Sequence, residues 1–404
     1  MIDNVLRGGP RYWTWLAFLF AVIAVGFACY YWQLDYGLAI TGMSRDVSWG
    51  FYIAQFTYLV GVAASAVMVV LPYYLHHYKA FGKITILGEF LAVSAVTMCV
   101  LFVIVDLGQP MRAMNVILYP TPNSIMFWDF IVLFGYLTLN IVIGWTMLTA
   151  ENKEVPPPGW VKPLIYISIP WAVSIHTVTA FLYAGMPGRE FWLTAIMAPR
   201  FLASAFASGP SLLILLALIV RRVTKFDPGK AAIEKLAVIV TYAMIVNIFF
   251  VLMEFFTAFY SQVPGHMHGL SYLFFGLGGR APLVPFMWVA AVLGIGAVIA
   301  LLFPQVKRDE RKLALAAVAI FVATWVDKGL GLIVAGFTPN PMGHITEYGP
   351  TLPELGITLG VYAIGFLVLT LLYKIAVGVR ESLGVGASRE ATVPAKEALA
   401  EAAH

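Results

Sequence analysis

One apolar stretch of this chain contains a histidine, an ionisable side chain that is costly to bury. The stretch SIHTVTAFLYAGMPGREFW runs from Ser174 to Trp192, with His176 in its apolar first half. On a helix, Thr179 and Tyr183 would share the face of His176. Imidazole titrates near neutral pH and suits proton transfer or hydrogen bonding to a ligand. A purely structural hydrogen bond between helices is the alternative, and spacing alone leaves it open.

Two other apolar stretches carry carboxylates in line with amides. Asp129, Tyr136 and Asn140 recur on one face of a helix, and Asn247 and Glu254 lie seven residues apart on another. Such groups are rare in apolar segments because their burial requires a partner. Each pattern therefore marks a face that we expect to point toward the interior of the molecule.

The adjacent pair Asp327 and Lys328 lies inside another apolar stretch. Neighbouring residues on a helix do not face each other, so each is expected to find its partner on a different helix. An ion-paired structural role is the alternative to a functional one. Gln55, within WGFYIAQF, adds an amide to the set of candidate residues.

The composition shows what must position these residues. Of 404 residues, 61% are hydrophobic and 11% are charged, whereas soluble domains carry about 25% charged residues. The chain is therefore expected to be an all-α integral membrane protein in a lipid membrane. Its net charge of +4 is small and its basic residues are scattered, which argues against a nucleic-acid partner.

Ten apolar stretches are long enough to cross the ~30 Å hydrocarbon layer. The first follows Arg7 and Arg11 without a cleavage site and is interpreted as an uncleaved span. Gly209-Pro210 is a candidate break in the sixth span, which would separate a shorter segment from it. The spans are expected near residues 13–34, 48–74, 85–105, 124–148, 164–184, 202–221, 235–260, 282–303, 312–336 and 356–379.

Lysine and arginine are distributed unequally between alternate loops. One set of loops holds most of them, and the other set holds only Arg45, Arg112, Arg189, Arg200 and Arg280. By the positive-inside rule, both termini face the cytoplasm. The outer half of the membrane and the outer loops then contain His176, Asp129, Glu254, Asp106, Arg112, His266, His268 and His344. A candidate site is therefore expected near the outer face.

The sequence offers few ligands for a resident metal centre. Cys29 and Cys99 are not part of a CxxC motif or a Cys/His cluster. A membrane haem needs two facing histidines, and only His176 is clearly buried. We therefore expect neither haem nor an iron–sulfur cluster in this chain.

Quinone chemistry would use the residue types that are present. It requires a pocket accessible from lipid, hydrogen-bonding groups for two carbonyl oxygens and a route for protons, for which His, Tyr, Gln and Asp are suited. A secondary transporter is an alternative, although no internal repeat is found. A pure membrane anchor is another, but it leaves the intramembrane acids unexplained.

Three long motifs resemble the polysulfide-reductase membrane-subunit family, also called NrfD/PsrC, and the resemblance covers about residues 40–350. They are TGMSRDVSWGFYIAQFTYLVGVAASA, VDLGQPMRAMNVILYPTPNSIMFWD and HTVTAFLYAGMPGREFWLTAIMAPRFLASAFASGPSLL. The resemblance implies two four-helix bundles with spans one and ten outside them. The expected divisions are 1–47 with the first span, 48–184 and 185–336 as the two bundles, 337–381 with the last span, and 382–404 as a disordered cytoplasmic tail.

The resemblance also implies menaquinone as substrate and a ferredoxin-like iron–sulfur subunit on the outer face. Within the family, the first two motifs are most similar to membrane subunits of Dsr-type complexes linked to sulfite reduction in sulfate reducers, with Hmc-type subunits next. A Dsr-type complex implies three further partners: a multihaem cytochrome c, a haem b membrane subunit and a cytoplasmic iron–sulfur protein.

Carried onto this sequence, the family motifs assign expected roles. The candidate quinone-binding residues are His176, Asp129, Gln55 and Tyr183. The candidate proton path comprises Glu254, Asn247, Asp327 and Lys328. Asp327 and Lys328 have no firm counterpart in the family. Structural or docking roles are expected for Asp106, Arg112, His266 and His268, with Asp106 and Arg112 forming a pair.

Overall fold

The computed structural model describes residues 2–384 and is built from helices. Ten of them, within the described residues, are long and apolar enough to cross a membrane, which confirms the predicted all-α membrane fold. Most of the tail predicted for 382–404 lies outside the described residues.

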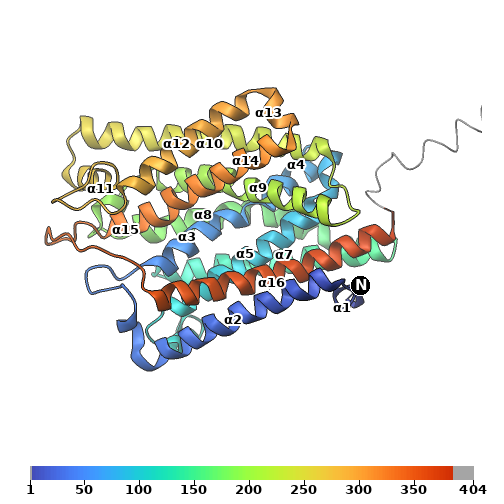
Figure 1. Cartoon of the computed structure of the whole chain (residues 1–404), viewed down its shortest axis with the longest axis horizontal. Helices are drawn as coiled ribbons and strands as arrows, with labels where there is room; N and C mark the ends of the chain where they lie inside the picture. The colour runs from blue at the N-terminus through green and yellow to red at the C-terminus, as the bar shows by residue number, and fades with distance from the viewer. Residues whose placement is uncertain (1, 385–404) are drawn as a thin grey trace, which may run out of the picture.

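The helices run roughly parallel to one another along the long axis of the molecule (Figure 1). The long ones are α2 (Pro10–Tyr36), α3 (Phe51–Ala63) continued by α4 (Val67–Tyr74), α5 (Thr85–Asp106), α7 (Ile125–Asn152), α8 (Val161–Ala184), α9 (Met197–Val223), α10 (Lys230–Tyr260), α12 (Val284–Leu302), α14 (Glu310–Thr324) continued by the π-helix η5 (Trp325–Gly331) and by α15 (Leu332–Gly336), and α16 (Leu352–Ser382). The short ones are α1 (Asp3–Leu6), α6 (Asn115–Leu118), α11 (Pro264–Phe274), α13 (Pro304–Arg308) and the 3-10 turns η1 (Gly37–Ile40), η2 (Lys79–Lys83), η3 (Pro110–Arg112) and η4 (Glu190–Trp192).

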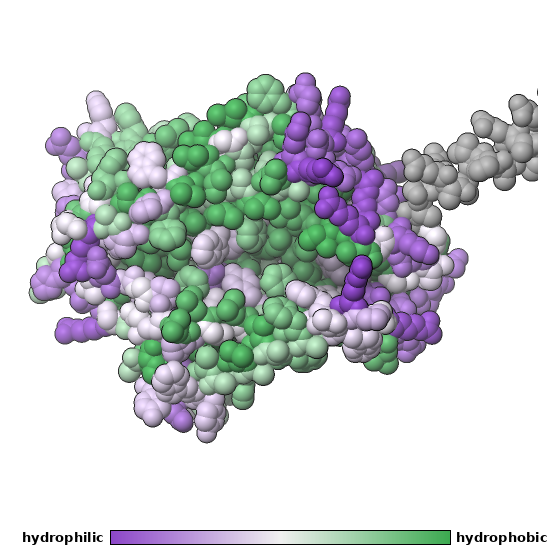
Figure 2. Space-filling model, in the orientation of Figure 1, coloured by the Kyte–Doolittle hydropathy of each residue, from purple (hydrophilic) through white to green (hydrophobic). Residues whose placement is uncertain are grey.

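The surface has the form expected of a membrane protein. Figure 2 shows an apolar band across the middle of the molecule, with hydrophilic residues gathered at both ends of the helices. Large apolar side chains point outward from this band, among them Phe27 on α2, Leu252 on α10 and Val292 on α12. Hydrocarbon, not water, is the solvent that such a surface matches. We call the end at which α3, α7, α9, α12 and α16 begin the charge-poor end.

Two groups of helices meet along a central seam. Helix α3 packs against α5, α7 packs against α5 and α8, and α9 packs against α10 and α14, while α12 packs against α14. The two groups are joined by contacts of α9 with α3 and α8 and by the contact of η5 with α3. Helix α16 packs on α5 and on α2. The division at residues 184 and 185 stays a prediction, but the seam is where the buried polar residues gather.

The expected break at Gly209-Pro210 is wrong, because α9 is continuous from Met197 to Val223. The break lies instead between α3 and α4, where residues 64–66 form a turn. A Cβ on Gly209 would approach the backbone N of Ser65 to 2.8 Å and the carbonyl O of Val62 to 3.0 Å. Glycine at 209 therefore lets α9 cover the irregular backbone of α3, which could not face lipid.

A second glycine contact holds α2 to the molecule. A Cβ on Gly26 of α2 would lie 2.6 Å from the Cα of Gly360 on α16. Helices in lipid associate largely through close backbone packing at small residues. Since α2 packs mainly on α16, this contact is central to its attachment.

Loops at the charge-poor end are tied together by buried hydrogen bonds. The fully buried Glu354 caps the start of α16 and accepts hydrogen bonds from Tyr348 Oη at 2.7 Å and from the Gly42 amide at 2.7 Å. Tyr348 Oη also accepts from the Phe51 amide at 2.6 Å. The starts of α3 and α16 are thereby fixed relative to each other.

Replacing Gly360 by leucine is expected to loosen α2 from α16. Forcing side-chain atoms into a filled contact typically costs about 1–3 kcal/mol, so the melting temperature in detergent should fall. Gly296→Leu on α12 is the matched control, because a Cβ at Gly296 meets nothing within 4 Å. Equal melting temperatures for the two variants would contradict the proposed role of the contact.

The loop contact of Asp46 is expected to depend on pH. A hydrogen bond from Thr346 at 3.0 Å, with help from Asn340, holds the pKa of Asp46 below its ordinary value. A carboxylate with a lowered pKa contributes its stabilisation above its unfolded pKa and loses it as pH falls through the folded value. Hydrogen exchange of residues 337–351, corrected for intrinsic rates, should therefore accelerate below about pH 4. Asp46→Asn should remove that acceleration; its persistence would refute the assignment.

Candidate functional site

A row of buried polar side chains on α8 faces α3 and α7. His176, Thr179 and Tyr183 are fully buried, as their shared helical face predicts. Thr179 Oγ1 donates to Asp129 Oδ1 on α7 at 2.6 Å, and Tyr183 Oη forms a hydrogen bond with Thr57 Oγ1 on α3. The structure thus brings three of the four candidate quinone-binding residues into one row.

His176 has the least satisfied side chain of the row. Neither ring nitrogen has a hydrogen-bond partner of good geometry among the described residues, although the carbonyls of Ala172 and Gly61 lie near the ring. Buried polar atoms without a partner are rare in native proteins. The ring is therefore available to a ligand or a water molecule.

Gln55 points away from this row. Its Oε1 accepts hydrogen bonds from Trp325 Nε1 of η5 at 2.8 Å and from Tyr362 Oη of α16 at 2.7 Å, while its Nε2 has no partner among residues 2–384. Gln55 therefore links α3 to η5 and α16 and makes no hydrogen bond to His176 or Asp129.

The intramembrane acids are joined by one arginine. Arg200 of α9 is only 8% exposed, and its guanidinium pairs with Glu254 of α10 and, at 2.7 Å, with Asp327 Oδ1 of η5. The expectation that Asp327 finds its partner on another helix is confirmed. The sequence missed Arg200 because the sixth span was expected to start at residue 202, whereas α9 starts at Met197. An arginine within the apolar run MAPRFLASAF was the signal that could have revealed it.

Lys328 follows Asp327 but occupies a different environment. Its Nζ lies 4.2 Å from the ring centroid of Phe201 and donates to the Phe201 carbonyl at 3.4 Å. A Cβ on Gly61, near the break of α3, would lie 3.1 Å from this Nζ. The π-helical turn at residues 325–331 directs the two neighbours apart, and such turns are frequent at functional sites.

Aromatic rings close the polar row at the charge-poor end. The ring of Tyr183 lies 5.7 Å from Trp49 and 5.2 Å from Trp192, and Phe337 packs edge-on against both tryptophans. Trp192 is fully buried and donates to the Leu332 carbonyl at 2.8 Å. The rings of Trp49, Trp192 and Phe337 thus lie between the row and the loops.

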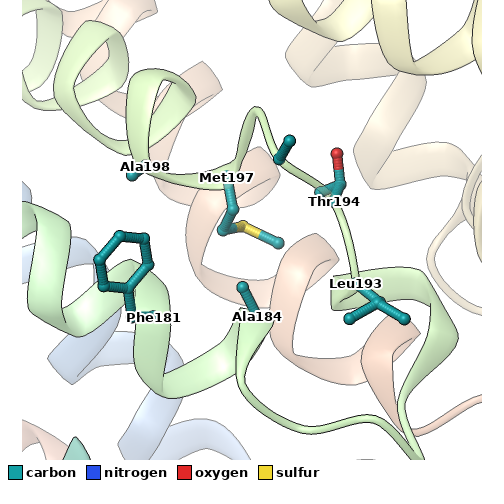
Figure 3. Close-up of a pocket in the computed structure, with 7 residues that line it drawn as sticks. Phe181, Ala184, Leu193, Thr194, Met197 and Ala198 are labelled. Atoms are coloured by element: carbon teal, nitrogen blue, oxygen red, sulfur yellow. The ribbon is translucent and has the colours of Figure 1, made fainter.

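Two cavities lie near these groups. A cavity of about 340 Å³ occupies the corner between the end of α8 and the start of α9. Figure 3 shows Phe181, Ala184, Met197 and Ala198 around it, with Leu193 and Thr194 on the connecting segment. A second cavity, of about 250 Å³, forms a groove between α10 and α12, and Asn247 and Asp327 are among its lining residues.

The candidate docking residues lie at the charge-poor end. Asp106 ends α5, and Arg112 lies exposed in η3. The prediction that these two residues pair is wrong, because no ion pair between them forms in the described part of the chain. The intervening turn points Arg112 to the surface, while Asp106 Oδ1 is buried. His266 and His268 lie on α11, and their docking role stays a prediction.

Two buried acids were overlooked, Glu354 at the start of α16 and Glu89. Glu89 of α5 is 4% exposed and lies at the opposite end of the molecule from the loops above. Arg380 is buried at the same end and binds Glu151 at 3.1 Å. Glu89 was visible in the sequence as an acid inside an apolar span. Within residues 2–384, no group of three or more His, Cys, Asp or Glu side chains is arranged to hold a metal ion.

Three known proteins are similar to this chain over most of its length. A provisionally named membrane subunit of a dimethyl sulfoxide reductase from Halobacterium salinarum is 25% identical over 88% of this chain and 89% of its own length. A selenate reductase subunit from Mesobacillus selenatarsenatis is 23% identical over 89% and 92%. The Hdr-like menaquinol oxidoreductase integral membrane subunit of Archaeoglobus fulgidus is 23% identical over 90% and 93%.

The profile of one family spans the candidate site. It is described as "Polysulphide reductase, NrfD", and it matches residues 39–339, which include the α8 row, Arg200 and both of its acidic partners. The resemblance that the three sequence motifs indicated is thereby confirmed: this chain belongs to the NrfD family of multi-pass membrane proteins.

Proposed function

We propose that this chain is the quinone-interacting membrane subunit of a multi-subunit respiratory oxidoreductase. It exchanges electrons between menaquinone and an iron–sulfur subunit bound at the charge-poor end, which faces the outside of the cytoplasmic membrane. The names of the relatives support the assignment, since two belong to reductases and one belongs to a menaquinol oxidoreductase. The loop charges support the orientation, with both termini in the cytoplasm.

The observation that carries this proposal is the unsatisfied ring of His176. Its two nitrogens are buried without a hydrogen-bond partner of good geometry in the described chain, one helical turn from Thr179, which donates to Asp129 Oδ1. A quinone carbonyl needs a hydrogen-bond donor, and its reduction needs a proton donor. His176 can donate the hydrogen bond and Asp129 can supply the proton, so the residue types of this site fit menaquinone. Bound menaquinone would carry the two electrons.

Each residue of the row has a distinct task in this proposal. His176 donates a hydrogen bond to a ring carbonyl and Asp129 holds the exchangeable proton, oriented by Thr179 Oγ1 at 2.6 Å. Tyr183 extends the row toward the charge-poor end, where the surrounding tryptophans exclude water. The cavity at the corner of α8 and α9 is lined by Phe181 and Ala184, which flank the end of the row on α8, and would be the apolar entrance. Gln55 contributes indirectly, because it fixes α3 to η5.

Proton translocation is a finer part of the proposal. Glu254, Asn247, Asp327 and Lys328 would form the proton path, and Arg200 joins its two acids. A buried ion pair can also have a purely structural role. The Asp327→Asn variant distinguishes that role from proton transfer.

The metabolic setting proposed here is sulfur or sulfite respiration. The similarity of the first two motifs to Dsr-type membrane subunits supports it. The partners would then include a multihaem cytochrome c, a haem b membrane subunit and a cytoplasmic iron–sulfur protein. Asp106, Arg112, His266 and His268 would lie under the external iron–sulfur subunit.

A secondary transporter is the second candidate function. The turn at residues 64–66 between α3 and α4 favours it, because transporters bind substrates at interrupted helices. Purification of the native assembly in mild detergent separates the two. Co-purification of an iron–sulfur subunit with bound menaquinone supports the proposed function, whereas a solitary, quinone-free protein would favour the transporter.

Replacing His176 by alanine is expected to lower quinone-dependent electron transfer by at least roughly 10²-fold, the usual contribution of a positioned proton-transfer group. The complex should still assemble, because the ring makes no hydrogen bond of good geometry with the described chain. Thr177→Val, on the exposed face of the same helix, is the matched control. A fully active, assembled His176→Ala complex would exclude this role.

Asp327→Asn is expected to impair proton coupling while quinone turnover continues. The amide can still accept from Arg200 but cannot carry a proton. The measurement is proton release per electron in proteoliposomes. Glu347→Gln, which alters an ion pair with Arg280 among the loops, is the control. An unchanged ratio in the Asp327 variant would assign the ion cluster to structure alone.

A further inference from the structure

The groove between α10 and α12 is open to the lipid-facing surface. Its cavity has a volume of about 250 Å³. Leu252 of α10 and Trp288 and Ile295 of α12 line it and are each about half exposed or more. Phe274, the last residue of α11, and the adjacent Phe275 also line it. A lipid-dissolved molecule can therefore enter sideways from the membrane.

Three polar residues lie at the floor of this largely apolar groove. Asn247 and Asp327 line it together with Thr324. Asn247 is 3% exposed and its Oδ1 has no hydrogen-bond partner within residues 2–384, while its Nδ2 lies 4.0 Å from Met244 Sδ. An unpaired buried amide oxygen costs free energy unless a ligand or water donates to it.

The polar atom of the floor that has no partner among residues 2–384 is an acceptor, Asn247 Oδ1, while Asn247 Nδ2 keeps a second N–H as a donor. The Thr324 hydroxyl donates to the Ile320 carbonyl at 2.7 Å, so its proton is already used. Asp327 accepts from Arg200 at 2.7 Å, and an ionised carboxylate has no proton to donate. A ligand that satisfies Asn247 Oδ1 must therefore bring a hydroxyl or N–H donor of its own.

The charge and shape of the groove narrow the ligand class. A second cation is not required for pairing, since Arg200 already binds both carboxylates. A phosphate headgroup carries acceptors and negative charge, which the carboxylates would repel. Phe255, Phe274 and Trp288 favour a flat aromatic ring. A neutral aromatic lipid with hydroxyl groups meets all of these conditions.

We propose that the α10–α12 groove is a second ligand site that binds the reduced, hydroquinone form of a lipophilic quinone. One hydroxyl donates to Asn247 Oδ1 and Asp327 accepts a second hydrogen bond, while the tail stays in the lipid. The oxidised quinone has only carbonyl acceptors and binds more weakly. This site lies in a different group of helices from His176. The inference rests on the proposed function in one respect, because both sites would take their ligand from the same membrane quinone.

The test is equilibrium binding of menadiol to the purified complex in nanodiscs under anaerobic conditions. Menadione and 1,4-dimethoxy-2-methylnaphthalene serve as ring-matched compounds without hydroxyl donors. We expect menadiol to bind at least roughly 10-fold more tightly than either, as the loss of one or two hydrogen bonds implies. Equal binding of all three compounds would overturn the requirement for donors.

Three variants locate the binding. Asn247→Leu removes the unpaired acceptor and Ala291→Phe fills the groove, and each should weaken menadiol binding by roughly 10-fold or more. Val292→Phe, on the 68% exposed lipid face of the same helix, should leave it unchanged. Binding lost in both groove variants and retained in His176→Ala supports the proposal.

The same panel separates this inference from the proposed function. Menadiol binding that is lost in His176→Ala and unaffected in both groove variants would overturn the second site and leave the first standing. No menadiol binding to the unmodified complex would overturn both.

Discussion

Satisfying polar groups away from water is the constraint on which the rest of this structure depends. Lipid supplies no hydrogen bonds, so a charged side chain within the membrane needs a partner from the chain itself. Arg200 meets this need for two helices at once, because its guanidinium binds Glu254 of α10 and Asp327 of η5. Removing one member of such a buried cluster typically costs about 3–5 kcal/mol. The cluster therefore fixes α9, α10 and η5 relative to one another.

The irregular backbone segments are consequences of the same constraint. The turn between α3 and α4 and the π-helix η5 are both packed within the protein. Gly209 allows α9 to cover the turn between α3 and α4. The π-helix η5 points Asp327 and Lys328 into separate environments. Irregular backbone at membrane depth is tolerated where protein surrounds it. The seam between the helix groups is therefore the place where unusual geometry and polar side chains occur together.

This arrangement gives the proposed function a physical basis. The α8 row has an imidazole without a well-formed hydrogen bond in the described chain, and Thr179 of the same row binds the Asp129 carboxylate beneath a layer of aromatic rings. The α10–α12 groove has the buried acceptors of Asn247 and Asp327 beneath its apolar walls. One region is suited to donate to an oxidised ring and the other to accept from a reduced one. Such a division would let the two redox forms of one carrier occupy different places.

The sequence by itself determined the class of fold, the ten spans and the face that carries His176, Thr179 and Tyr183. These follow from hydrophobicity and helical periodicity, which act along the chain. It also located Asp129 and Asp327 as residues in need of partners. The identity of those partners depended on contacts between helices far apart in sequence. Only the tertiary structure placed Arg200 inside α9, turned Gln55 toward Trp325 and left Asp106 and Arg112 unpaired. The start of a helix, the side to which a π-turn directs a side chain and the depth of a groove are set by packing, and no local pattern encodes them.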